Sequence, residues 1–374
     1  MYTVFALQRP KARLSSVVVL AAIALTSQLS AACPKVETRM AGLLFPEKVH
    51  FSVTVIAHRG LWGESAPNPR TPENSLASLQ AADDACIDAV ELDVKMTRDG
   101  IPVIMHDHNL GRTTDIYNFI GDKTQYDPIL NTGSNPAVKT VPWETVKGLN
   151  LLTPSRDSAT DYTVPSVTDV FDYWKDHHLT IPIIFDAKTK DAVHAIDVRA
   201  REQFGDRSRD IVAVKVNATL YPTYASFTND ATAIQAIPVY TTNMLEKIDV
   251  TASIDDWRGR RGSTAFEVNV KQFLGLLQGQ LDTVKNANYA VGVFNAIPDG
   301  PGDGQFYYND GRCCYRLSDI YFSYPGGKDT ADNRGDFDYL RGQSFTFITT
   351  DHPLALRDYL HATQPSRMGA LRTP

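Results

Sequence analysis

Eight short runs rich in valine, isoleucine and phenylalanine constrain the fold of this 374-residue chain more than any other feature. They are Val53–Ala57, Ala89–Val94, Ile181–Asp186, Ile211–Val216, Ile237–Tyr240, Thr264–Asn269, Ala290–Asn295 and Phe345–Thr349. Their length and β-branched composition are typical of buried strands. Stretches with helical spacing, such as Val193–Phe204 and Val270–Asn286, separate the later runs. Eight strands alternating with helices predict an α/β fold, the (β/α)8 or TIM barrel.

Two segments interrupt this alternation. Residues 107–180 are too long for one loop and one helix, so we expect an insertion after strand 2. Before it, Val103–His106 is predicted to form the return strand of a hairpin whose turn is Arg98-Asp99-Gly100. Residues 298–343 form a long loop after strand 7. Such loops are usually functional or disordered, and one that follows a barrel strand is expected over the catalytic mouth.

The amino terminus has the order of a secretory signal. Basic residues precede the apolar run Val17–Leu25, and Ser30-Ala31-Ala32 forms a small-residue cleavage site. We therefore expect residues 1–32 to be a signal peptide and 33–374 to be a single barrel domain of a periplasmic or secreted protein. The alternatives are an uncleaved anchor and a lipid attached to Cys33, although Ser30 departs from the usual lipoprotein signal.

Charge and cysteine content narrow the function further. The formal net charge is −6, which does not suit a nucleic-acid partner. Four cysteines lie beyond the predicted signal: Cys33, Cys86, Cys313 and Cys314. An exported chain meets an oxidising environment, so one disulfide is expected, but its pairing is left open. Cys86, just before a predicted strand, is interpreted as a buried free thiol.

Chemically active side chains cluster near the first two predicted strands. His58 and His106 each follow an apolar run, and a pair of histidines can take and give protons near neutral pH. Glu91 and Asp93 lie two residues apart on one strand and therefore share a face. If that face is inward, the two carboxylates need a partner such as a hard cation, Mg²⁺ or Ca²⁺. The alternative is an outward, solvated pair.

The order of short motifs in this region resembles the glycerophosphodiester phosphodiesterase (GDPD) family of phospholipase C-like TIM barrels. The matching motifs are His58-Arg59-Gly60, Pro72-Glu73-Asn74, Glu91-Leu92-Asp93, Thr97-Arg98-Asp99-Gly100 and His106-Asp107. The resemblance is dense up to about Thr114, returns at Ile183–Lys188 and Ile348–Pro353, and is thin between them. It implies a TIM barrel independently of the strand count.

The resemblance also implies roles for individual residues. His58 and His106 would be the catalytic acid and base, in an order left open, and Glu73, Glu91 and Asp93 would lie at the metal. Asp186-Ala187-Lys188 stands where the family has Glu-x-Lys, so Asp186 would bind the metal with a shorter side chain. The remaining assignments are phosphate binding by Arg59 and Lys188 and support of the site by Asn74 and Asp351. Arg59 could instead brace Glu73, and Asn74 could simply cap a helix.

These features predict a metal-dependent phosphodiesterase that hydrolyses small-molecule glycerophosphodiesters to glycerol 3-phosphate and an alcohol. A first alternative is a phospholipase D-like enzyme of the sphingomyelinase D type, in which the aromatic-rich residues 306–324 could form a lipid-facing lid with transient membrane contact. A second is a non-catalytic binding protein on the same barrel. The family's Trp-Thr-x-Asn is replaced by Val293-Phe294-Asn295, which leaves the alcohol open. Oligomeric state is not indicated.

Overall fold

The computed structural model describes residues 33–46, 53–120, 123–260, 265–317 and 331–363. These described residues form one compact unit. The predicted signal, residues 1–32, lies outside the described residues. Within the described ranges, no helix is long and apolar enough to cross a bilayer.

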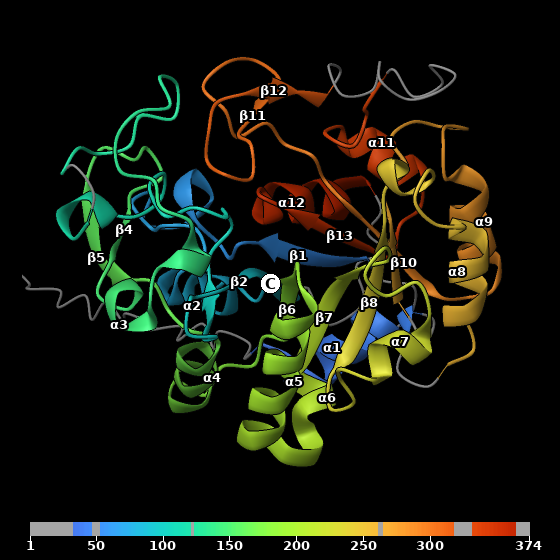
Figure 1. Ribbon diagram of the computed structural model, residues 1–374. Helices are drawn as coiled ribbons and strands as arrows, with labels where there is room; N and C mark the ends of the chain where they lie inside the picture. Colours follow the sequence, from blue (N-terminus) through green and yellow to red (C-terminus); the bar gives the residue numbers. More distant parts are fainter. Residues whose placement is uncertain (1–32, 47–52, 121–122, 261–264, 318–330, 364–374) are drawn as a thin grey trace, which may run out of the picture. The chain divides into compact units, whose positions relative to one another are not determined.

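Eight parallel strands of the described chain close into a barrel (Figure 1), as predicted. They are β1 (Thr54–His58), β2 (Ala89–Met96), β6 (Ile183–Ala187), β7 (Val212–Asn217), β8 (Gln235–Tyr240), β9 (Ala265–Val268), β10 (Ala290–Phe294) and β13 (Phe347–Thr350). Their spatial order follows the chain, and β1 pairs with both β13 and β2. The hairpin return strand is confirmed as β3 (Pro102–Ile104), antiparallel to β2.

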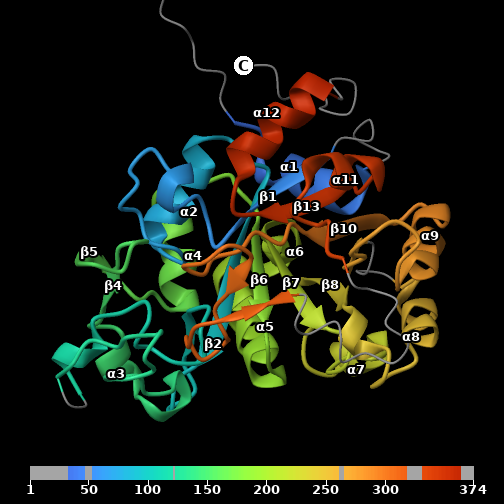
Figure 2. The ribbon, with the colours of Figure 1, turned by 90° about the horizontal axis from the view of Figure 1, so that it is seen from above.

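Helices follow most of the strands and cover the barrel (Figures 1 and 2). They include α2 (Leu76–Asp84), α4 (Val167–Asp176), α5 (Lys190–Phe204), α6 (Ser208–Ile211), α7 (Tyr224–Thr228), α8 (Val250–Trp257), α9 (Gln278–Asn286), α11 (Phe337–Gly342) and α12 (Pro353–Thr363). The predicted helix over Val270–Asn286 is too long, because α9 begins only at Gln278. Leu274 and Leu277 before it have positive φ, and Lys271 donates to Thr242 on another loop.

One end of the barrel is filled by an apolar layer to which every strand contributes. Its members are Ile56, Ala89, Ile184, Ala213, Ile237, Ala265, Ala290 and Phe347. Met40, Leu43 and Leu44 of α1 (Val36–Leu44) join this layer, so α1 closes that end. Gly292 makes room for the Phe347 ring, since a Cβ at this glycine would lie 1.9 Å from a ring carbon.

The next layer towards the carboxyl ends of the strands is polar. Side chains two residues apart on a strand point to the same side of it. The residues two positions after the apolar layer therefore also point into the barrel, among them His58, Glu91, Asp186, Lys215, Glu267 and Thr349. Contacts across the barrel confirm this placement. Lys215 Nζ lies 2.7 Å from a carboxylate oxygen of Glu267 and donates to Thr349 Oγ1 at 2.8 Å. The barrel core therefore changes from apolar to ionic along its axis.

Replacing Lys215 with methionine should destabilise the fold by about 3–5 kcal/mol, because it leaves the buried Glu267 carboxylate without its partner. Urea denaturation of the two proteins measures the difference. The matched control is Lys215→Met combined with Glu267→Leu, which removes both charges and should recover most of the loss. Equal stability of Lys215→Met and the parent would contradict the structural role of this pair.

The insertion has a small core of its own. Its apolar residues, which pack together outside the barrel, are Val103, Met105, Leu110, Ile116, Val138, Val141, Val146, Leu149, Leu151 and Val164. It contains α3 (Trp143–Val146) and the antiparallel pair β4 (Asn150–Leu152) and β5 (Ala159–Thr163). The predicted range 107–180 is too long, because α4 within it packs Phe171 and Trp174 on the barrel core.

The long loop after β10 reaches back to the insertion. It forms a short hairpin of β11 (Gln305–Phe306) and β12 (Tyr315–Arg316), and α11 at its end is a barrel helix. Backbone hydrogen bonds join His108 N to Asn309 O and Cys313 N to Pro128 O. The described part of the loop thus lies against the segment that follows β3, on the side of the strand ends (Figures 1 and 2).

All four cysteines are paired. Cys33, just before α1, bonds with Cys86, just after α2, and Cys313 bonds with its neighbour Cys314. The prediction that Cys86 is a free thiol is wrong. Cys86 has positive φ (51°) and leaves α2 in the direction of α1, a tertiary proximity that local sequence does not indicate.

Candidate active site

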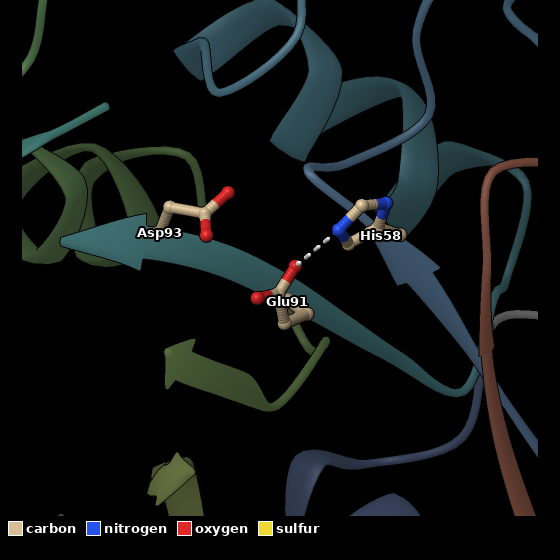
Figure 3. Close-up of side chains that lie close together, drawn as sticks. All are labelled: His58, Glu91 and Asp93. Atoms are coloured by element: carbon tan, nitrogen blue, oxygen red, sulfur yellow. Dashed lines mark ion pairs between the residues drawn. The ribbon is translucent and has the colours of Figure 1, made fainter. Parts of the chain in front are cut away.

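Strand register brings the predicted residues together at the carboxyl ends of β1, β2 and β6. His58 on β1 pairs with Glu91 on β2, and Asp93 pairs with Asp186 on β6. The structure decides that Glu91 and Asp93 point inward, since both are almost fully buried and face the site (Figure 3). His58 Nε2 lies 3.9 Å from Glu91 Oε2.

The turn after β1 fixes the direction of His58. Arg59 and Gly60 both have positive φ, 57° and 86°, which turns the chain sharply away from the strand. Gly60 cannot be replaced without movement, because a Cβ there would lie 2.2 Å from Ser78 Oγ on α2. Ser78 in turn donates to the Arg59 carbonyl. This packing holds the strand end and the His58 ring in place.

Asp351, after β13, orients His58. The Nδ1 atom of His58 lies 2.8 Å from Asp351 Oδ1, which leaves Nε2 directed towards Glu91. Burial opposes a charge on His58, but Asp351 and Glu91 outweigh it and raise the pKa of this histidine. Phe294 packs edge-on against the ring at 4.7 Å between centroids. Phe294 belongs to the segment that departs from the family motif, and it limits the movement of His58.

Asp351→Asn should lower the pKa of His58 in metal-free protein, because it removes the nearest negative charge. His58 carries its proton below this pKa, so the titration midpoint should move to lower pH. NMR titration of the imidazole signals measures it. Exposed His177, which contacts Tyr173, is the internal control. An unchanged His58 midpoint would contradict the assigned role of Asp351.

His106 is held in the same way by Asp107 and Arg112, whose role was not predicted from local sequence. Its Nδ1 atom lies 2.7 Å from Asp107 Oδ1, and both oxygens of Asp107 accept hydrogen bonds from Arg112. Asp107 and Arg112 are fully buried. The signal for them was present in the sequence as the acid directly after His106 and the arginine of Arg112-Thr113-Thr114-Asp115.

The two histidines act on different members of the carboxylate pair. His58 contacts Glu91, and His106 is the strongest stabilising charge on Asp93. Burial opposes the ionisation of Asp93, but His106 and Arg59 hold its pKa below the usual range. Each histidine is oriented through Nδ1 by a carboxylate, so its other ring nitrogen can exchange a proton with a ligand.

The buried carboxylates fit a hard cation. Ligand atoms of His58, Glu91 and Asp93 all lie within 4.8 Å of one another. Burial and the negative charge of Asp93 raise the pKa of Glu91 to about 7, and Asp186 adds to this effect. A divalent cation among these oxygens would remove that cost. The donor set thus suits a metal ion, and its identity is not specified.

Glu73 and Asp186 have other partners. Glu73 lies 3.2 Å from Arg59 Nη1, 3.6 Å from Arg112 Nη2 and 3.8 Å from Arg156 Nη2. The expected alternative, that Arg59 braces Glu73, is therefore present in the structure. Asp186 forms an ion pair with Lys188, whose side chain is exposed. The metal-binding roles of Glu73 and Asp186 and the phosphate-binding role of Lys188 stay predictions.

Asn74 directly supports the metal candidates. It has positive φ (54°), and its side chain donates to Asp93 Oδ2 and accepts from Asp93 N. The helix cap is the next residue, Ser75, which forms a capping box with Ser78. Asn74 therefore fixes Asp93 rather than capping α2.

The loop after β10 adds two residues that local sequence did not identify. Asp299 Oδ2 lies 3.7 Å from Arg59 Nη1. The ring of Tyr307 contacts the guanidinium groups of Arg112 and Arg156, at 4.7 and 5.3 Å from its centroid. These contacts place the loop over the mouth of the barrel, as predicted for this segment.

Comparisons with known proteins agree with this geometry. The sequence profile of the glycerophosphoryl diester phosphodiesterase family matches residues 58–293, more than half of the chain. The chain belongs to this family. Human glycerophosphodiester phosphodiesterase 1 is 32% identical over 138 residues, which cover 36% of this chain and 34% of the human protein. The chain thus aligns with about a third of that relative's length.

Solved structures of the family share the fold. A glycerophosphoryl diester phosphodiesterase from Parabacteroides distasonis superposes with a TM-score of 0.54 at 14% identity, over 88% of this chain and 93% of that chain. A phosphodiesterase from Oleispira antarctica, in complex with the product sn-glycerol-3-phosphate, gives 0.52 at 18% identity, over 83% and 97%. At these identities the likeness establishes the fold of this family member and nothing further.

Proposed function

We propose that this protein hydrolyses glycerophosphodiesters to glycerol 3-phosphate and an alcohol. The observation that carries the proposal is the pair of histidines, each oriented through Nδ1 by a carboxylate, beside the buried Glu91–Asp93 pair. Membership of the family supports it. So does the Oleispira antarctica neighbour, which binds sn-glycerol-3-phosphate.

The reaction requires two proton transfers. One histidine, His58 or His106, takes the proton of the nucleophile, either water or the adjacent glycerol hydroxyl, as its oxygen forms a bond to phosphorus. The other gives a proton to the alcohol oxygen as the second phosphorus–oxygen bond breaks. If the glycerol hydroxyl attacks first, water opens the cyclic phosphate with the two roles exchanged. Arg59, which lies 3.6 Å from Asp93, would hold the phosphoryl oxygens.

We further propose that Glu91 and Asp93 hold Ca²⁺ or Mg²⁺, with Asp186 on the neighbouring strand. When bound, the ion would neutralise charge on the phosphoryl oxygens. Burial and the negative charge of Asp93 raise the pKa of Glu91 to about 7, and a bound cation would offset this cost, which supports the proposal.

Purified mature protein assayed against glycerophosphocholine, with and without chelator, tests the activity. Micellar lysolipid and sphingomyelin in the same assay separate the phospholipase D-like alternative. Turnover of these lipids alone would favour that alternative, and no turnover of any diester with added metal would favour a binding protein.

We also propose that the protein is exported and that its mature chain begins at Cys33. The pairing of Cys33 with Cys86 supports this, because disulfides persist in oxidising compartments. In the native host, the protein should be found in the periplasm or medium, with residues 1–32 removed. Amino-terminal sequencing and fractionation measure this. A cytosolic protein that starts at Met1 would contradict the proposal.

A further inference from the structure

A cavity of about 360 Å³ lies beside the candidate site, between the insertion and the loop after β10. This volume falls within the range of small-molecule sites, roughly 300–1,000 Å³. Its lining includes Arg112, Gln125, Tyr126, Asp127, Arg156 and Tyr307. None of these residues belongs to a barrel strand, so the cavity is built from the two segments that interrupt the regular barrel.

The cavity lies on the His106 side of the site. Arg112, in its wall, donates two hydrogen bonds to Asp107, which holds His106. Arg156, also in its wall, lies 3.8 Å from Glu73. A phosphodiester between the two histidines has two ester arms, and the arm on the His106 side would enter this cavity.

Two guanidinium groups, those of Arg112 and Arg156, and one carboxylate, that of Asp127, line the cavity. Glu73 lies within 4 Å of three guanidinium groups, those of Arg59, Arg112 and Arg156, and Arg59 also lies near Asp93 and Asp299. Arg112 is also balanced by Asp107, but Arg156 has no closer carboxylate in the described structure. The acid in the wall, Asp127, already accepts the backbone N–H groups of the two residues after Pro128.

The aromatic rings do not form a site for a cation. Recognition of a quaternary ammonium group uses ring faces that are open to the ligand. Here the guanidinium groups of Arg112 and Arg156 already contact the ring of Tyr307. A choline group would meet two positively charged guanidinium groups and a ring that these groups already contact.

We propose that this cavity, which we call the alcohol pocket, binds the leaving alcohol and selects one that carries an anionic group such as a carboxylate. The proposal rests on the proposed diesterase function. Arg156 is the specificity-determining residue, because its side chain is partly accessible and paired only loosely with Glu73. Its Nη1 donates to the Pro154 carbonyl, which fixes the guanidinium at the wall.

Glycerophosphoserine and glycerophosphoethanolamine test the proposal, because they differ by one carboxylate. Wild-type protein should hydrolyse the serine diester with a kcat/KM about tenfold higher, the effect of one hydrogen bond to a charged group. Arg156→Gln should bring the ratio close to one, and Arg156→Lys should retain part of it. Arg199→Gln, on an exposed surface pair with Glu202, is the matched control and should keep the wild-type ratio.

Equal kcat/KM values for the two diesters, or a preference for the ethanolamine diester, would overturn the proposed selectivity of the alcohol pocket. The proposed function would remain intact. An unchanged ratio in Arg156→Gln would overturn the role of Arg156. If neither diester is hydrolysed, dissociation constants from calorimetry decide the same question. Tighter binding of the serine diester, lost in Arg156→Gln, would then support the pocket while the proposed function fails.

Discussion

Replacing His58 or His106 with alanine should each lower kcat for glycerophosphodiester hydrolysis by about 10²-fold or more, the usual contribution of a positioned acid or base. The expectation follows from geometry. Each ring is held by a hydrogen bond to a carboxylate through Nδ1, so its other nitrogen is available for proton transfer. Steady-state kinetics with glycerophosphocholine, at saturating substrate and metal, measure the loss.

Folding must be preserved for this result to be interpreted. His177→Ala is the matched control, because His177 is exposed at the end of α4 and contacts Tyr173 away from the barrel mouth. It should retain wild-type kcat. Circular dichroism and the denaturation midpoint of each variant should stay near the parent values. Near-wild-type turnover by either His58→Ala or His106→Ala would remove that histidine from the mechanism.

Removal of divalent metal should abolish activity, and adding back Ca²⁺ or Mg²⁺ should restore it. Burial of Glu91 and the negative charge of Asp93 raise the pKa of Glu91 to about 7, and a cation would relieve this cost. Metal should also stabilise the fold, by about 2.7 kcal/mol at a free concentration 100 times Kd. Thermal unfolding with and without chelator measures this independently of activity. Full activity in excess chelator, with no metal found by elemental analysis, would contradict the metal proposal.

Variants of the carboxylates distinguish ligands from supporting residues. Asp93→Asn should weaken metal binding by more than the roughly 10–100-fold expected when an outer partner is lost. Glu73→Gln should weaken it less, because Glu73 lies among three arginines in the structure. Asp186→Glu, which restores the family residue, should be tolerated and should not weaken binding of the metal ion. Calorimetric titration with Ca²⁺ measures the dissociation constant of each variant. A larger loss of affinity in Glu73→Gln than in Asp93→Asn would reverse these assignments.

Local sequence patterns were sufficient for the barrel and for the order of its motifs. All eight predicted strands are present. A buried parallel strand has an apolar, β-branched run, which can be recognised without knowing which strands lie beside it. The hairpin after β2 is present for the same reason, since its turn residues are adjacent in the chain. The predictions of the helix before β10 and of the limits of the insertion were less accurate. There, tertiary contacts such as that of Lys271 with Thr242 determine the backbone.

Local patterns were enough to identify the residues that could do chemistry: two histidines and several carboxylates at the ends of predicted strands. The tertiary structure alone decided which face Glu91 and Asp93 occupy, because a strand pattern gives the alternation of side chains but not its direction. It also decided the partners, since Asp351 orients His58 across 293 residues and Cys86 pairs with Cys33 across 53. Such pairs form where the closed barrel brings distant segments of the chain together, and no local propensity encodes that proximity.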